Sequence, residues 1–360
     1  MLYIWETRKI EDIMKDSLIK QLGKASGESR FARYSTAREC LIVNVLPEIA
    51  RKQPNLTDHG PVHVKEVLDN ACELLGNEIS KLNGMELYCL LLSILFHDVG
   101  NIVDRKKHEA EVSPIYDFVF PRQAGHQDVE EKQLVLDICA AHCGKAVDGT
   151  NDTLQYVRER SKLERCEIRP ALLAPILRFA DELAEGEYRT SSYMISHHEY
   201  ASNSVTFHQY ANCSKIDIDR QNGRIILSYH ICLKPPPDMD FGELDMAGSV
   251  ENPNDGRNIQ ISDLDHFLQF IYDRIEKLNQ ERQYTKHYCT LLQPFTRTTV
   301  TIDFLCGHYQ LPIDLQQVEI RDLVVPGDPH KTLIEYNAAY EPRRVLEMLE
   351  KAIREIKSHE

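Results

Sequence analysis

Two ionisable side chains end a strongly apolar stretch of the sequence and indicate where its chemistry lies. His97 and Asp98 follow the run 90–96, where apolar positions recur at the spacing of a buried helix. Desolvating an unpaired charge costs on the order of several kcal/mol, so the pair needs a partner. A shielded imidazole nitrogen beside a carboxylate oxygen suits a divalent cation. The alternative is a His–Asp pair that is hydrogen-bonded within a core.

Two more histidines come before this helix. His59 and His63 flank Pro61, which fits the first turn of a helix capped near Thr57 or Asp58. If the helix begins early enough, the two rings share one of its faces. Each ring alone is typical of a cap or a surface residue, but two of them upstream of a buried His–Asp pair favour a joint site.

A second carboxylate interrupts another apolar helix, expected over 171–184. Asp181 shares its face with leucine, isoleucine and alanine. A buried aspartate needs a cation, which a metal or Arg178 would supply. Arg178 is therefore either a ligand for substrate phosphate or a structural partner of Asp181 or Glu182.

A basic trio, Arg105, Lys106 and Lys107, follows the His–Asp pair and precedes a helix expected over 109–115. The trio is either a solvated loop or, because of its position, a holder of substrate phosphates.

The segment 134–144 repeats the first pattern, since an apolar helix again ends in a histidine, His142, before a glycine. Cys139 and Cys143 lie near His142. We do not expect a zinc cluster from them, because the chain has no second cysteine pair with matching spacing.

The order His63, His97–Asp98, Asp181 on successive expected helices resembles the HD-domain superfamily of metal-dependent phosphohydrolases. The signature of that superfamily is H…HD…D on an all-helical bundle. Three local segments look like its ligand segments: HVKEV at 63–67, LFHDVGN at 95–101 and LRFADEL at 177–183.

The resemblance covers roughly residues 40–200. The segment LTDHG at 56–60 also looks like a branch of HD proteins found in bacterial conflict systems. The resemblance to the superfamily implies one metal bound by His63, His97, Asp98 and Asp181. Some members bind a second metal through intervening histidines, and here His108 and His142 fall at those places, with Asp98 bridging both ions. His126 is a weaker substitute, in a segment expected to be a loop. Cys143 departs from the paired histidines that two-metal branches often carry.

His59 is similar to the general-acid histidine in the H-N-x-x-H motif of cyclic-nucleotide phosphodiesterases, with Gly60 in place of the asparagine. The resemblance implies that His59 protonates the departing oxygen. Asp98 is the second expected catalytic residue, through the metal that it holds.

The expected function is hydrolysis of a phosphoester or phosphoanhydride bond in a nucleotide-like substrate by metal-activated water. One or two divalent ions are expected. The ligand types alone do not determine whether the metal is Mn, Fe, Mg or Zn. Two alternatives stay open. One is a catalytically silent nucleotide and metal sensor that signals through its C-terminal domain, and the other is a single-strand nuclease.

Length and composition limit the domain organisation, the partners and the cellular compartment that we expect for this chain. A length of 360 residues predicts two domains, an all-helical bundle over 1–200 and a smaller α+β domain over 201–360. The net charge of −14 argues against duplex nucleic acid as a partner. No stretch is expected to span a membrane, and no signal peptide is recognised. The scattered cysteines are typical of reduced core residues in a cytoplasmic protein.

The ends of the chain carry no recognisable chemistry. Residues 1–56 predict amphipathic helices with a loop over 23–29. In the second half, period-two alternation predicts strands over 205–210 and 215–219, and a hairpin turn at Asn222–Gly223 leads into a strand over 224–233. The remaining expectations are a loop over 238–258, a helix over 264–278, a strand over 298–305 and a helix over 345–356. This half is expected to shape substrate access, form a homo-oligomer or bind a partner.

Overall fold

The computed structural model of the protein describes residues 5–103, 108–121, 125–234, 256–307, 309–322 and 331–359. The chain divides into two compact units. The first comprises Met1–Ala184 and Glu281–Phe295, and the second comprises Glu185–Gln280 and Thr296–Glu360. The sequence analysis placed a single boundary at residue 200. In the structure the first unit ends earlier, at Ala184, and it also includes the later segment Glu281–Phe295.

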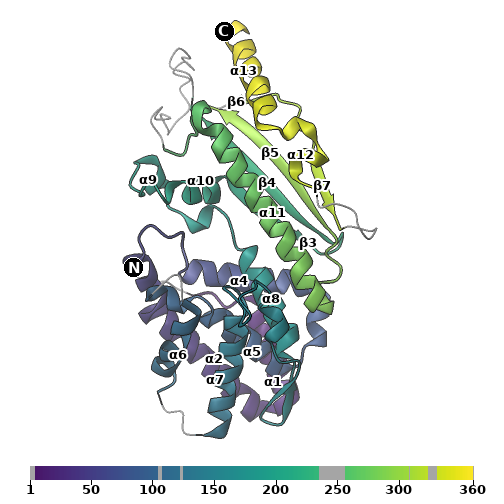
Figure 1. The fold of residues 1–360 in the computed structure, drawn as a ribbon. Coiled ribbons are helices and arrows are strands. Elements are labelled where there is room, and N and C mark those ends of the chain that lie inside the picture. Colours follow the sequence, from purple (N-terminus) through teal and green to yellow (C-terminus); the bar gives the residue numbers. More distant parts are fainter. Residues whose placement is uncertain are drawn as a thin grey trace. The chain divides into compact units, whose positions relative to one another are not determined.

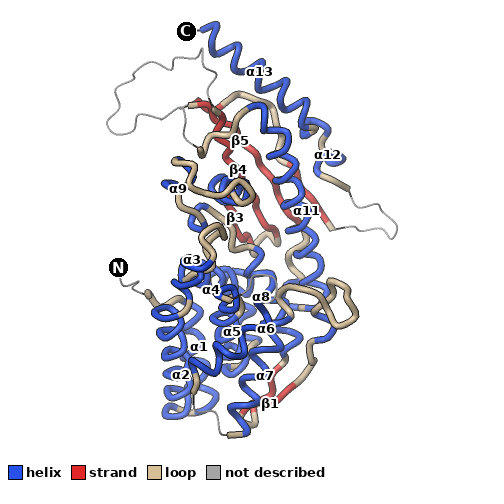
Figure 2. The backbone as a smooth tube through the Cα atoms, turned by 60° about the vertical axis from the view of Figure 1, so that its left-hand side comes forward, coloured by secondary structure: helices blue, strands red, loops and turns tan. Residues whose placement is uncertain are grey.

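The first unit is a helical bundle with one short β-hairpin (Figures 1 and 2). This architecture confirms the predicted fold class. Its elements are α1 (Lys9–Leu22), α2 (Lys24–Asn44), α3 (Leu46–Lys52), α4 (Pro61–Leu75), η1 (Gly76–Lys81), α5 (Gly84–Phe96), η2 (Val99–Ile102), α6 (His108–Val119), α7 (His126–Ala140), η4 (Leu154–Tyr156), β1 (Ser161–Leu163), β2 (Cys166–Ile168), α8 (Pro170–Glu182) and η7 (Thr290–Leu292).

Helix α5 forms the core of this unit. A capping box fixes its start, because the Asn83 side chain accepts from the Glu86 N–H while the Glu86 carboxylate accepts from the Asn83 N–H. All of its residues are buried, and it packs against α1, α2, α4, α7 and α8. The helix therefore delivers the residues that follow it, His97 and Asp98, into the middle of the bundle.

The stretch Gly84–Ile102 is also long and apolar enough to span a membrane, which differs from the sequence expectation. Length and composition alone are weak evidence for a span, and 94% of the tested window is buried inside the fold. Here the stretch forms the core of the bundle.

Helices α4 and α8 pack on each other and carry His63 and Asp181. The Asn70 side-chain amide of α4 donates to the Ala180 carbonyl of α8 at 3.1 Å, which ties the helices together one residue before Asp181. Helix α4 begins at Pro61 with Gly60 as its N-cap, and the His63 N–H donates to the Asp58 carboxylate at 3.4 Å, so that Asp58 lies near the cap as expected. His59 therefore precedes the helix instead of sharing a face with His63.

Gly100 allows α6 to approach the turn that follows Asp98. A Cβ atom at this position would lie 2.6 Å from the carbonyl carbon of His108 and 2.8 Å from its Cα. Real Cβ atoms essentially never come within 3.0 Å of such atoms, so only glycine fits here. Gly100 thus sets the position of the His108 backbone beside the turn.

Two expectations about local structure in this unit are wrong. The loop predicted over 23–29 reduces to Gly23, which has φ 82, and α2 begins at Lys24. Gly27 then lies inside α2, where an added Cβ would meet the Ile19 backbone at 2.6 Å, so this glycine serves close helix packing and not a turn. His126 begins helix α7 and does not lie in a loop.

The second unit contains a five-stranded sheet with flanking helices, the α+β region that the sequence predicts (Figure 2). Its strands are β3 (Ser214–Asp219), β4 (Arg224–Leu233), β5 (Arg297–Cys306), β6 (Tyr309–Gln310) and β7 (Val318–Arg321). Strands β3 and β4 are antiparallel, β4 and β5 are parallel, and β6 and β7 pair antiparallel with opposite ends of β5. The long connection between β4 and β5 contains α11, as parallel pairing requires.

The helical elements of this unit are η5 (Glu187–Arg189), α9 (Ser192–Ser196), α10 (Val205–Cys213), η6 (Ile261–Asp263), α11 (Leu264–Tyr288, whose end from Glu281 counts in the first unit), α12 (Leu333–Tyr336), η8 (Ala338–Tyr340) and α13 (Pro342–His359). The strand predicted over 205–210 is wrong, because these residues begin α10. The hairpin turn is confirmed, with Gly223 at φ 64. Of the predicted loop over 238–258, residues 238–255 lie outside the described ranges.

We predict that Gly100→Ala lowers the free energy of unfolding by about 1–3 kcal/mol, because the added methyl group overlaps the His108 backbone. Urea unfolding of the full chain measures the loss. Gly125→Ala is the control, since its Cβ would come no closer than 3.4 Å to a side-chain oxygen of Asp128, and it should lose less. Equal stability of Gly100→Ala and the wild type would contradict this close approach.

Candidate metal centre

Four side chains from three parts of the bundle converge on one point. His63 comes from the first turn of α4, His97 and Asp98 from the end of α5, and Asp181 from the last turn of α8. The Nε2 atom of His63 lies 3.1 Å from Asp181 Oδ1 and 3.4 Å from Asp98 Oδ2. The Nε2 atom of His97 lies 3.5 Å and 3.3 Å from the same two oxygens. The structure therefore brings together the four ligands that the resemblance implies.

The donor set fits a divalent cation. The Nε2 atoms of His63 and His97 are buried and face the carboxylate oxygens, yet they make no hydrogen bond within the described part of the chain. Buried polar atoms are normally satisfied, so two such nitrogens aimed at one point indicate a missing partner. The four candidate ligand atoms all lie within 4.8 Å of one another. A single ion would satisfy them together.

Hydrogen bonds to the backbone fix which nitrogen of the histidines faces the centre. His97 Nδ1 donates to the Ile94 carbonyl at 2.8 Å, so its Nε2 carries the lone pair in the neutral ring. His142 Nδ1 donates to the Cys139 carbonyl in the same way. Such outer contacts are typical of metal-binding histidines.

The buried charges stabilise one another. Burial alone raises the pKa of the Asp98 carboxyl, but the charged His97 and the neighbouring His59 hold that pKa well below its usual value. Burial lowers the pKa of His97, but Asp98 and Asp181 outweigh this effect and raise it to about 10. Without a cation, the His97 ring therefore holds a proton that metal binding must displace.

His59 lies at the rim of this group. Its Nδ1 contacts the Thr57 carbonyl at 2.5 Å, and its Nε2 lies 3.8 Å from Asp98 Oδ2. Its side chain is 14% exposed, whereas that of His63 is fully buried. The ring thus reaches both the centre and solvent from outside helix α4.

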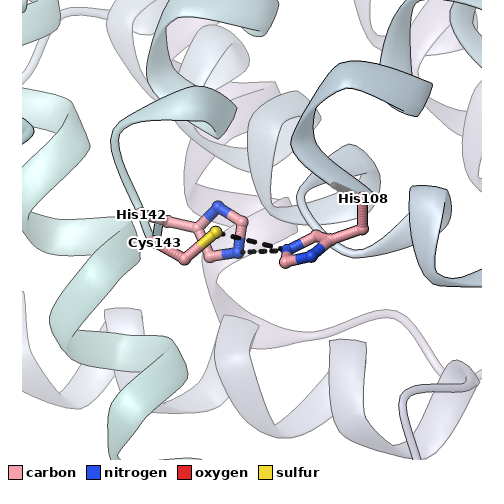
Figure 3. A group of neighbouring side chains, drawn as sticks. All are labelled: His108, His142 and Cys143. Carbon is pink, nitrogen blue, oxygen red and sulfur yellow. Dashed lines mark hydrogen bonds between the residues drawn. The ribbon is translucent and has the colours of Figure 1, made fainter. Parts of the chain in front are cut away.

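A second group of donors lies on the other side of Asp98. His108 begins α6, and His142 and Cys143 follow the end of α7, so that the three side chains face one another (Figure 3). His108 Nε2 lies 3.3 Å from both His142 Nε2 and Cys143 Sγ. Asp98 Oδ1 lies 3.4 Å from His108 Nε2 and 3.7 Å from His142 Nε2. The two oxygens of Asp98 therefore face different groups of ligands.

The thiol of Cys143 is the functional group that the sequence analysis did not include. Burial raises its pKa, but the charged His142 and the hydrogen bond with His108 lower it to about 6. The sequence signal was present, because Cys143 stands where a paired histidine was expected. Cys139 lies apart from this group and donates to the Ser93 carbonyl at 3.4 Å.

Arg178 has a structural role, as one of the two alternatives from the sequence expects, but its ion-pair partner is Glu281. Its guanidinium makes a bidentate ion pair with Glu281 at 2.6 and 2.7 Å. It also donates to Thr153 Oγ1 and to the Ala141 carbonyl at the end of α7. These contacts assign Arg178 to holding the end of α7, next to His142, and its role as a phosphate ligand stays a prediction. Arg105, Lys106 and Lys107 lie outside the described residues.

Comparison with known proteins identifies one relationship. A family model named HD-CE, an HD-containing domain, matches residues 53–236, just over half of the chain. No curated protein and no solved structure matches the chain.

We predict that Arg178→Ala and Glu281→Ala each lower the free energy of unfolding by about 1–3 kcal/mol, because each leaves a largely buried charge without its partner. The double variant should lose less than the sum of the single losses. Urea unfolding of the full cycle measures the coupling. Arg158→Ala, from a more exposed pair with Asp137, is the control and should cost about 0–1 kcal/mol. Additive losses together with a raised KM for substrate would instead support Arg178 as a phosphate ligand.

Proposed function

Because the chain belongs to the HD-CE family of HD-containing domains, we propose that it is a metal-dependent phosphohydrolase. It cleaves a phosphoester or phosphoanhydride bond of a nucleotide-like substrate. The observation that carries the proposal is the convergence of His63, His97, Asp98 and Asp181, with the Nε2 atoms of both histidines buried and unsatisfied. A hydrogen-bonded His97–Asp98 pair, the alternative interpretation, would not account for the second histidine and the second carboxylate that face the same point.

The chain's own residues hold and orient the reacting groups. The cation would be bound by His63, His97, Asp98 and Asp181. The buried helix α5 holds His97 and Asp98, which directly follow it, in the core of the bundle. A divalent cation at such a site lowers the pKa of water toward 7 and neutralises charge on phosphoryl oxygens. Asp181 is the most open of these four ligands, with a side chain that is 24% exposed, and it marks the side from which substrate reaches the site.

His59 supplies the proton for the departing oxygen. Its Nδ1 contact with Thr57 leaves Nε2 as the atom that exchanges a proton with substrate. This nitrogen lies 3.8 Å from Asp98 Oδ2, at the edge of the candidate metal centre. Because the His59 side chain is partly exposed, the leaving group of a bound substrate can reach the proton on Nε2.

A nucleotide-like phosphate remains the proposed substrate class. The basic trio Arg105–Lys107 follows the centre in sequence and is proposed to neutralise further phosphates. The net charge of −14 disfavours duplex nucleic acid as substrate and leaves a small phosphorylated molecule as the better match. The role of the second unit in oligomerisation stays a prediction.

We predict that Asp98→Ala abolishes both bound metal and hydrolysis while leaving the helical content largely intact, because Asp98 contributes an oxygen to each group of ligands. Elemental analysis, circular dichroism and a broad screen of nucleotides measure the three properties. Asp117→Ala, which removes an exposed carboxylate paired with Lys132, is the matched control and should keep metal and activity.

The same screen separates the proposal from its rival. Metal-activated turnover of any nucleotide by the wild type supports the hydrolase. A metal-loaded wild type that turns over no phosphoester would indicate a sensor. An active, metal-free Asp98→Ala protein would refute the metal centre itself.

We predict that His59→Gln keeps the bound metal and lowers kcat on the order of 100-fold for a substrate with an alkoxide leaving group. A 4-nitrophenyl ester should lose far less, because its leaving group needs no proton. Steady-state kinetics with both substrates, alongside metal analysis, tests this role. Equal losses on the two substrates would rule out proton donation by His59.

A further inference from the structure

A row of three arginines crosses the sheet of the second unit. Arg224 on β4 lies opposite Arg297 on β5, and Arg297 lies opposite Arg321 on β7 (Figure 1 shows the three strands). Residues that pair directly across a sheet point to the same face, so all three guanidinium groups lie on one side of it. Neighbouring strands are about 4.8 Å apart, which makes the row about 10 Å long.

The row is accessible to solvent. The side chains of Arg224 and Arg297 are each 33% exposed, and that of Arg321 is 72% exposed. The next residues along β4 and β5, Ile225 and Thr298, point to the opposite face and are fully buried. The arginines therefore lie on the more open face of the sheet, where a ligand from solution can reach them.

The carboxylates beside the row do not neutralise it. Like charges directly opposite one another destabilise a sheet unless anions lie between them. In the described part of the chain, two carboxylates pair with the row. Asp219 accepts from Arg224 Nε at 2.8 Å, and Glu319 accepts from Arg297 Nη1 at 3.4 Å and from Arg321 Nε at 2.5 Å. Three guanidinium groups against two carboxylates leave one positive charge.

The two outer arginines keep donors for a ligand. Within the described residues, Arg224 and Arg321 donate through Nε alone, so both terminal nitrogens of each side chain stay available. Arg297 uses Nη1 for Glu319 and Nη2 for the Asn222 carbonyl at 2.9 Å, contacts that hold its side chain between the other two. Guanidinium N–H groups bind phosphate oxygens in pairs, with better geometry than the ammonium of lysine.

The shape and chemistry of this face indicate which anion fits. By the register of the described strands, no Phe, Tyr or Trp side chain points to this face, so the bases of a nucleic-acid strand would find no stacking partner on it. A single carboxylate would occupy only part of a row of this length. Linked phosphates carry several charges along a line and match the row better.

We propose that Arg224, Arg297 and Arg321 bind the linked phosphates of a small molecule such as a nucleoside triphosphate. The row belongs to the second unit and the candidate metal centre to the first, so the proposal does not depend on the proposed hydrolysis. It gives the second unit a ligand of its own. Because the row contacts phosphate oxygens, inorganic triphosphate is a sufficient probe of it.

Isothermal titration calorimetry with inorganic triphosphate tests the site. The full-length protein is titrated in the presence of a chelator, so that no metal contributes to binding. Wild type should bind triphosphate, and the affinity should fall at least about tenfold in Arg297→Gln and in Arg321→Gln. The affinity of the wild type should also fall as the salt concentration rises, because the row is partly exposed. Arg343→Gln, which removes the same charge from an exposed position on α13, is the control and should match the wild type.

Glu319→Gln separates ligand binding from a purely structural role of the arginines. This change removes the carboxylate that competes for Arg297 and Arg321. Triphosphate should therefore bind more tightly to Glu319→Gln than to the wild type, although the sheet loses two ion pairs. Circular dichroism checks the fold of each variant, and Arg321→Gln, at the most exposed position of the row, is the variant least expected to disturb it.

Three results would overturn the inference. The first is a wild type that binds no triphosphate at low salt, and the second is equal affinity in the wild type and in folded Arg321→Gln. The third is a single-stranded oligonucleotide that binds more tightly than triphosphate and loses affinity in the same variants, which would assign the row to nucleic acid.

Discussion

The carboxylate of Asp98 is the interaction on which the rest of the site depends. A buried carboxylate without partners would protonate, because desolvation disfavours its charged form. Here the histidine rings around it reverse that preference and hold its pKa well below the usual value. Its two oxygens face two groups of nitrogen donors, so one side chain organises both. Without it, His63 and His97 would keep the carboxylate of Asp181, whereas His108 and His142 would lose the carboxylate oxygen that faces them.

The bundle is built to keep this carboxylate in place. Helix α5 is buried over its whole length, and its capping box fixes where it starts, so the residues after Phe96 have little freedom to move. Gly100 admits the His108 backbone, Asn70 ties α4 to α8, and Arg178 fastens the end of α7. Each contact acts on a helix end that carries a candidate ligand. The positional precision of the centre thus comes from structural contacts between helices, outside the ligands themselves.

The sequence revealed the first group of ligands because each lies beside a strong apolar helical pattern. It revealed less where local pattern and tertiary packing disagree. Residues 205–210 alternate as a strand would, but they form α10, since a short alternating run fits either structure. The partner of Arg178, Glu281, lies far along the chain in α11, and no local pattern links the two. Cys143 entered the sequence analysis as part of a zinc cluster that was not expected and as a departure from paired histidines, because its convergence with His108 depends on how α6 and α7 pack.

Anomalous diffraction from crystals of the metal-loaded protein, with data collected on both sides of the absorption edge of the ion, tests the central claim most directly. The account predicts an anomalous peak within bonding distance of His63 Nε2, His97 Nε2, Asp98 Oδ2 and Asp181 Oδ1. A fully loaded crystal with no peak there, and with the Asp98 carboxylate hydrogen-bonded to protonated rings instead, would contradict it.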